Sequence, residues 1–178
     1  MPKWLPYLTD KDGRRAPFLL ARLTSATDRA LRPVFVDAKL DTGTSCCGVP
    51  SSVINECARI SMPLVRGITQ DYTGAFEQVE RPTYWFHLEL CPSEAPRAAL
   101  SDQQLERLLQ TAPLPYCTKR NSCDDRVLGL RMVLTETDYV LIGHNVLANW
   151  TVILHGRSSH FKIMDRGGKW FIFSLAPR

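Results

Sequence analysis

Three consecutive residues, Asp41, Thr42 and Gly43, are the strongest candidates for chemistry in this sequence. An aspartate carboxylate can take a proton from water and, when protonated, can polarise a carbonyl group, which is general acid–base chemistry. The same residue can instead be a turn aspartate that accepts a hydrogen bond from its own backbone just before a glycine. The tripeptide is short enough to occur by chance, so its setting in the chain has to decide between the two interpretations.

The surrounding pattern predicts a strand that ends at Asp41. Residues 18–23 and 34–40 are apolar-rich with partial alternation, which is typical of strands, and the polar residues 25–32 predict a loop between them. Pro33 can open the second strand, where a missing N–H does least harm, and the turn-forming residues from Asp41 close it. Further strands are predicted at residues 83–90, 131–134, 138–142, 150–154 and 170–175.

One helix is well marked, from about residue 102 to residue 111. Ser101 provides its N-cap and Gln104 the third residue of a capping box, and two prolines stop it. It lies in residues 92–126, a polar, proline-rich stretch that we interpret as an insertion. A short helix is expected to start at residues 143–147. The pattern favours one all-β domain over residues 1–178, with one or two helices.

Composition excludes several classes of protein. Hydrophobic residues make up 44% of the 178 residues, enough for a core without metals or disulfide staples. The net charge of +4 is spread along the chain, which argues against nucleic acid or a membrane as partner. No apolar run approaches the roughly 18 residues of a membrane helix, and the amino end lacks a signal-peptide pattern, so we expect a cytoplasmic protein.

A second motif follows the strand predicted at residues 138–142. There Gly143, His144 and Asn145 precede an apolar pair. Together the two motifs resemble those of the retropepsin-like aspartic proteases. In that family the first motif is an apolar pair, Asp, Thr or Ser, Gly and a small residue. The second is an apolar pair, Gly, a basic or other residue, Asp or Asn, and another apolar pair. The resemblance extends from about residue 18 to residue 154.

The resemblance implies a retropepsin-like acid-protease barrel, with a short helix after the second motif and an extra inserted helix. It also implies an aspartic endopeptidase that acts on polypeptides and needs no metal or organic cofactor. Two carboxyl groups are required and the chain has one Asp-Thr-Gly, so a homodimer is expected in which two copies of Asp41 meet and share one proton. By the same resemblance, Thr42 braces the pair and Gly43 lets the substrate backbone approach.

A hairpin over residues 67–82 is the candidate for the flap that closes over substrate in this family, with Tyr72, Thr73 and Gly74 at its tip as substrate-binding residues. The residues from Asp71 to Gly74 are predicted to form a turn. By the same resemblance, the chain ends, at residues 3–5 and 170–175, are expected to interleave in the dimer interface.

The second motif departs from the retroviral members. They usually have Arg at the position of His144 and Asp at the position of Ser45, so a bracing ion pair is replaced here by at best a hydrogen bond between these two side chains. His144 is interpreted as structural, because the chemistry needs no imidazole. The altered motif and the insertion leave open a non-catalytic peptide-binding or assembly domain with a protease-like fold.

The cysteines support further interpretations. Cys46 and Cys47, beside Asp41, could form a redox switch or could be small buried apolar residues. A cysteine-based metal or redox protein would require these two to converge with Cys117 and Cys123, without the paired spacing that zinc sites usually show. No metal site is therefore predicted.

Overall fold

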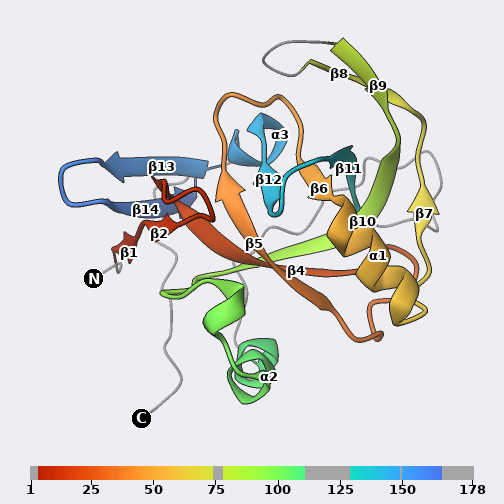
Figure 1. The fold of residues 1–178 in the computed structure, drawn as a ribbon, viewed down its shortest axis with the longest axis horizontal. Helices are drawn as coiled ribbons and strands as arrows, with labels where there is room; N and C mark the ends of the chain where they lie inside the picture. Colours follow the sequence, from red (N-terminus) through yellow and green to blue (C-terminus); the bar gives the residue numbers. More distant parts are fainter. Residues whose placement is uncertain (1–3, 74–77, 111–128, 149, 166–178) are drawn as a thin grey trace.

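A computed structural model of the protein describes residues 4–73, 78–110, 129–148 and 150–165. A closed barrel of six strands forms its centre (Figure 1), in the order β11-β6-β12-β5-β4-β10, with β10 pairing back onto β11. The barrel strands are β4 (Phe18–Ser25), β5 (Val34–Leu40), β6 (Gly48–Pro50), β10 (Thr83–Cys91), β11 (Leu130–Thr135) and β12 (Val140–Ile142). The predicted all-β class is confirmed.

The interior of the barrel is filled by apolar side chains from alternate residues of its strands. On β4, Leu19, Ala21 and Leu23 are fully buried in the main core, and Leu23 lies opposite Leu88 of β10. The intervening residues of β4 face outward, because successive side chains of a strand point to opposite faces. Each fully buried leucine contributes about 2 kcal/mol or more through removal of apolar surface from water.

Three α-helices accompany the barrel in the described residues. Helix α1 (Ser51–Arg59) follows β6 and buries Val53 and Cys57 in the main core. This helix was not predicted from the sequence. Helix α2 (Asp102–Gln110) confirms the predicted helix. Its capping box is formed, with the Ser101 N–H donating to Gln104 Oε1 at 2.8 Å and the Gln104 N–H donating to Ser101 Oγ at 3.3 Å. Helix α3 (His144–Leu147) confirms the short helix after the second motif.

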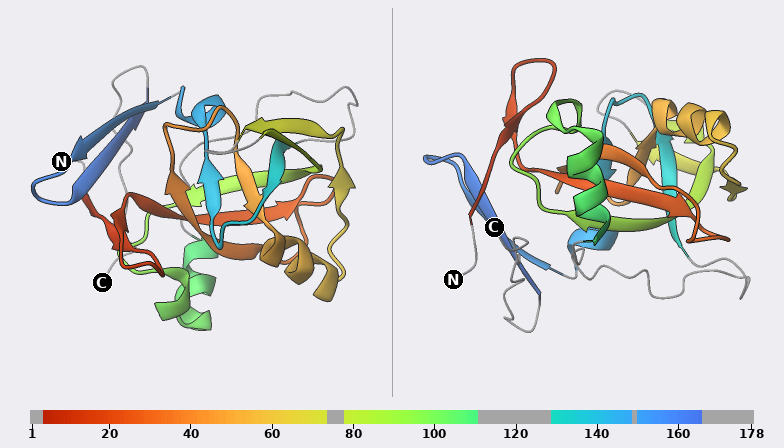
Figure 2. Two further views of the ribbon diagram at one scale, coloured as in Figure 1. Left: turned by 45° about the horizontal axis from the view of Figure 1, so that its top comes forward. Right: turned by 90° about the horizontal axis from the view of Figure 1, so that it is seen from below.

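Smaller sheets surround the barrel (Figure 2). A three-stranded sheet consists of β1 (Leu5–Pro6), β14 (His160–Asp165) and β13 (Trp150–His155). A two-stranded sheet consists of β2 (Leu8–Thr9) and β3 (Arg15–Ala16). Strand β7 (Val65–Arg66) extends the barrel sheet beside β10. Strand β14 was not predicted. The strand predicted at residues 170–175 lies outside the described residues, so the interface role of the chain ends stays a prediction.

Strands β8 (Gln70–Thr73) and β9 (Gln78–Arg81) form the hairpin predicted over residues 67–82. The turn predicted from Asp71 is wrong up to Thr73, because these residues pair with β9 as a strand. The inserted segment contributes a 3-10 helix, η1 (Arg97–Ala99), and α2, whose Leu105 packs on Leu20 outside the barrel. Within the described residues, no helix has the length and apolar character needed to cross a membrane.

Candidate active site

Strand β12 lies between two strands that are consecutive in the chain. Residues 41–47 join β5 to β6, and β12 pairs parallel with β5 and antiparallel with β6. Leu40 is the register partner of Ile142, so the residues that follow them, Asp41 and Gly143, emerge side by side. The Asp41 N–H donates to the Ile142 carbonyl oxygen at 3.0 Å. The two sequence motifs therefore meet at one end of the barrel.

The Asp41 carboxylate is half-exposed and lies in its own turn. Its Oδ1 accepts a hydrogen bond from the Gly43 N–H at 2.9 Å, which is the bond expected of a turn aspartate. Among the described residues, no interaction engages Oδ2. A Cβ on Gly43 would come within 3.2 Å of Oδ1, so glycine leaves room around the carboxylate. The turn geometry therefore occupies one oxygen of Asp41 and leaves the other available.

Residues of the second motif hold the β5–β6 loop from behind. The His144 N–H donates to the Thr44 carbonyl oxygen at 2.8 Å, and the Asn145 N–H donates to the Ser45 carbonyl oxygen at 3.1 Å. Within the part of the chain that the structure describes, this backbone contact takes the place of the hydrogen bond expected between the His144 and Ser45 side chains. The bracing therefore does not depend on the imidazole.

Cys47 links the loop to the second motif through its side chain. Its thiol donates to Asn145 Oδ1 at 3.2 Å, and its Sγ accepts the Gly143 N–H at 3.3 Å. Burial raises the pKa of the Cys47 thiol to about 12, so it stays protonated and unreactive near neutral pH. This bridging role could not be predicted from the sequence, because only the fold shows that the thiol of residue 47 faces the amide of residue 145.

We predict that the stability advantage of wild type over Cys47→Ala shrinks as pH rises. The folded state keeps the Cys47 proton well above pH 9, because its pKa is raised to about 12, whereas the unfolded chain releases it. The advantage is complete below about pH 9 and falls by about 1.4 kcal/mol per pH unit above it. Urea denaturation of both proteins at pH 7.5, 9 and 10.5 measures the difference. A difference that does not change with pH would contradict the buried, hydrogen-bonded thiol.

The hairpin β8–β9 and the β5–β6 loop lie at the same end of the barrel (Figures 1 and 2). Tyr72 and Thr73 belong to β8, where they are register partners of Val79 and Gln78. Gly74 lies outside the described residues. The substrate-binding role of these three residues stays a prediction.

No group of three or more potential metal ligands occurs among the described residues. Cys46, Cys47, Cys57 and Cys91 are free thiols. Burial raises the pKa of Cys46, which is half-buried in the β5–β6 loop. Cys117 and Cys123, which the cysteine-based interpretation requires, lie outside the described residues.

No protein-family model matches the sequence, and no curated protein matches it. Among solved structures, the chain is similar to that of EIAV protease complexed with the inhibitor HBY-793. The match has 14% sequence identity and a TM-score of 0.37, and it covers 79% of this chain and 92% of that chain. A likeness at this level does not assign a family, so the function has to be inferred from the residues of this chain.

Proposed function

We propose that the protein is a homodimeric aspartic endopeptidase in which each protomer contributes Asp41. The observation that carries the proposal is the position of this carboxylate, at the end of barrel strand β5 with Oδ2 available, on a loop hydrogen-bonded to Gly143, His144 and Asn145. A general base must be held in one geometry, and a loop anchored on a second strand provides that.

A single Asp41 cannot supply both an acid and a base at once. Thr42 and Gly43 are exposed and Asp41 is half-exposed, so a second copy of the loop has access to the first. In the proposed dimer the two carboxyl groups lie about 3 Å apart and share one proton, because like charges at that distance cannot both ionise. Thr42 braces the pair from its exposed position in the turn.

The proposed reaction is hydrolysis of a peptide bond in an extended substrate between the Asp41 pair and the β8–β9 hairpin, with Tyr72, Thr73 and Gly74 covering the substrate. The ionised Asp41 takes a proton from water, and the water oxygen attacks the scissile carbonyl carbon. The protonated Asp41 of the partner subunit gives its proton to the carbonyl oxygen. The partner's Asp41 then takes back a proton from a hydroxyl of the tetrahedral intermediate, the C–N bond breaks, and the leaving nitrogen takes the proton that the first Asp41 removed from water.

Cleavage of a diverse peptide library across pH 4 to 7, together with the mass of the protein in solution, tests this proposal. We expect a dimer that cleaves a subset of the peptides. A dimer that binds peptides and cleaves none would favour the non-catalytic peptide-binding or assembly domain instead. A strict monomer would contradict the proposed active site, since the second carboxyl group would be missing.

A further inference from the structure

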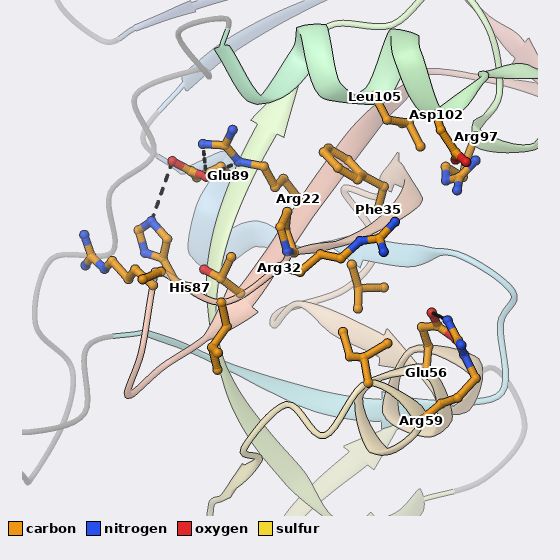
Figure 3. Close-up of a pocket in the computed structure, with 17 residues that line it drawn as sticks. Arg22, Arg32, Phe35, Glu56, Arg59, His87, Glu89, Arg97, Asp102 and Leu105 are labelled. Atoms are coloured by element: carbon orange, nitrogen blue, oxygen red, sulfur yellow. Dashed lines mark hydrogen bonds and ion pairs between the residues drawn. The ribbon is translucent and has the colours of Figure 1, made fainter.

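A cleft lined by five arginines lies on the outside of the barrel, with a volume of about 890 Å³ (Figure 3). The arginines are Arg22, Arg29, Arg32, Arg59 and Arg97. Strands β4, β5 and β10 form its floor, and α1, α2 and residues 29–33 form its sides. Val34 and Phe35, at the start of β5, line the cleft, whereas Asp41 follows the last residue of that strand. A strand rises about 3.3 Å per residue, which places the cleft about 20 Å from Asp41.

The floor of the cleft carries polar side chains in register. Thr24 of β4 lies opposite His87 of β10, and Arg22 lies opposite Glu89. These residues alternate with the core-facing residues of the two strands, so their side chains point out of the barrel. Thr24 and His87 are nevertheless only 5% and 6% exposed. Two neighbouring polar groups are thus buried outside the main hydrophobic core.

Both of these groups lack hydrogen-bond partners among the described residues. The atoms concerned are Thr24 Oγ1 and His87 Nδ1. The other ring nitrogen of His87 lies 3.7 Å from Glu89 Oε1. Buried polar atoms are nearly always paired, and an unpaired one costs free energy. Two unpaired atoms on facing residues, both lining one cleft, therefore indicate a ligand group that pairs with them.

The charges around the cleft favour an anion. Arg22 pairs with Glu89 and Arg59 pairs with Glu56. Neither Arg29 nor Arg32 forms an ion pair within the described ranges, and Arg32 lies in the middle of the cleft in Figure 3. Burial is the largest cause that lowers the pKa of His87; the charge of Arg29 lowers it further, whereas Glu89 raises it. The guanidinium groups of Arg29 and Arg32 are the charges that attract a negative ligand.

We propose that this cleft binds a small organic phosphate, whose phosphate oxygens accept hydrogen bonds from Thr24, from the guanidinium of Arg29 and from Nδ1 of a His87 ring that is protonated beside the bound anion, with Arg32 adding charge. Phosphate fits better than a carboxylate, because it offers more acceptor positions to several converging donors and matches the planar guanidinium fork. The cleft also has apolar walls, formed by Phe35, Ile60 and Leu105 among others. These walls, and a volume far above that of a phosphate ion, call for an apolar portion of the ligand.

Calorimetric titration of the full chain with phenyl phosphate, inorganic phosphate and benzoate tests the proposal. We expect saturable binding of phenyl phosphate, about tenfold tighter than of inorganic phosphate and of benzoate. The double variant Arg29→Gln/Arg32→Gln should lose at least about tenfold in affinity for phenyl phosphate. The matched control Arg14→Gln/Arg15→Gln removes the same charge from two exposed residues outside the cleft and should bind as wild type does.

Thr24→Val separates binding from folding. Removal of a buried, unpaired hydroxyl should raise the Tm of the ligand-free protein by about 3 °C and weaken phenyl phosphate binding several-fold. A lower Tm would mean that the hydroxyl already has a partner and would contradict the proposal. Asp41→Asn should bind phenyl phosphate as wild type does, so the result does not depend on proteolytic activity.

Three results would overturn the proposal. One is no saturable binding of phenyl phosphate up to about 10 mM. Another is equal weakening in both double variants, which would show attraction to overall charge alone. The third is binding of an aspartate-rich octapeptide that depends on Arg29 and Arg32 while phenyl phosphate fails to compete, which would make the cleft a site for acidic polypeptides.

Discussion

Replacing Asp41 with asparagine should lower peptide cleavage by about a thousand-fold or more, because the proposed reaction loses both its base and its shared proton. The fold should survive the change. Asparagine keeps a side-chain oxygen that can accept the Gly43 N–H, which Asp41 Oδ1 accepts at 2.9 Å, and the side chain is half-exposed. The measurement is the initial rate of cleavage of a peptide selected from the library, with the circular dichroism spectrum as the check on folding.

Asp28→Asn is the matched control. Asp28 is exposed, and its Oδ1 accepts the Ala30 N–H at 2.9 Å, so it has the same local turn bond as Asp41 without the anchored loop. Its substitution should leave cleavage within about twofold of wild type. If wild type and Asp41→Asn cleave the peptide at equal rates, Asp41 is only a turn aspartate, and the proposal that the protein is an aspartic protease is wrong.

Mixing the two proteins tests whether the site is shared between protomers. With a threefold excess of Asp41→Asn, activity per wild-type chain should fall to about a quarter, since random pairing leaves about one wild-type chain in four with a wild-type partner. Subunits have to be allowed to exchange before the assay. Unchanged activity per wild-type chain would show that one Asp41 is sufficient and would contradict the dimeric site.

Much of the barrel could be predicted because its strands show period-two alternation along the chain. The prediction of residues 34–40 as a strand matches β5 in both bounds, and Pro33 precedes it. The helix at α2 was found because its capping box is local in sequence. Strand alternation and a capping box each depend on a few neighbouring residues, so both can be recognised in the sequence without knowledge of the rest of the fold.

Two missed elements had local signals of different strength. Helix α1 buries Val53 and Cys57, four residues apart as on one face of a helix, but it begins after Pro50 with no side-chain capping bond and contains β-branched residues. In strand β14, His160 and Lys162 alternate with the buried Phe161 and Ile163, so a period-two signal is present over these four residues and ends where Met164 follows Ile163. Tertiary burial outweighs the local pattern in α1, whereas β14 was missed although its pattern is that of a strand.

The active-site geometry depends on contacts between distant residues. The sequence shows two motifs, one at Asp41 and one at Gly143. It does not show that β12 pairs between β5 and β6, because strand pairing and register are not determined by any local pattern. The Cys47 bridge follows from that pairing. The arginine-lined cleft could not be predicted from the sequence for the same reason, since Thr24 and His87 become neighbours only through the register of β4 and β10.

Gly143→Ala should destabilise the protein by about 3 kcal/mol and abolish cleavage. A Cβ at this position would lie 2.3 Å from the carbonyl oxygen of Cys46 and 2.4 Å from its carbonyl carbon. These are backbone atoms of the β5–β6 loop and cannot turn aside as a flexible side chain would. The φ of Gly143 is −85°, which alanine adopts freely, so the cost is steric rather than conformational. Urea denaturation measures the loss.

The control for this steric argument is Gly156→Ala. A Cβ on Gly156 would meet no atom within 4 Å among the described residues, so the substitution should be neutral or stabilise by up to about 1 kcal/mol through the unfolded chain. The two substitutions add the same methyl group, and only the one at Gly143 pushes against the loop that carries Asp41. If both variants unfold like wild type, the second motif is not packed on that loop. If Gly143→Ala unfolds at a lower urea concentration than wild type while Gly156→Ala does not, the close packing of Gly143 against the Cys46 backbone stabilises the loop that carries Asp41.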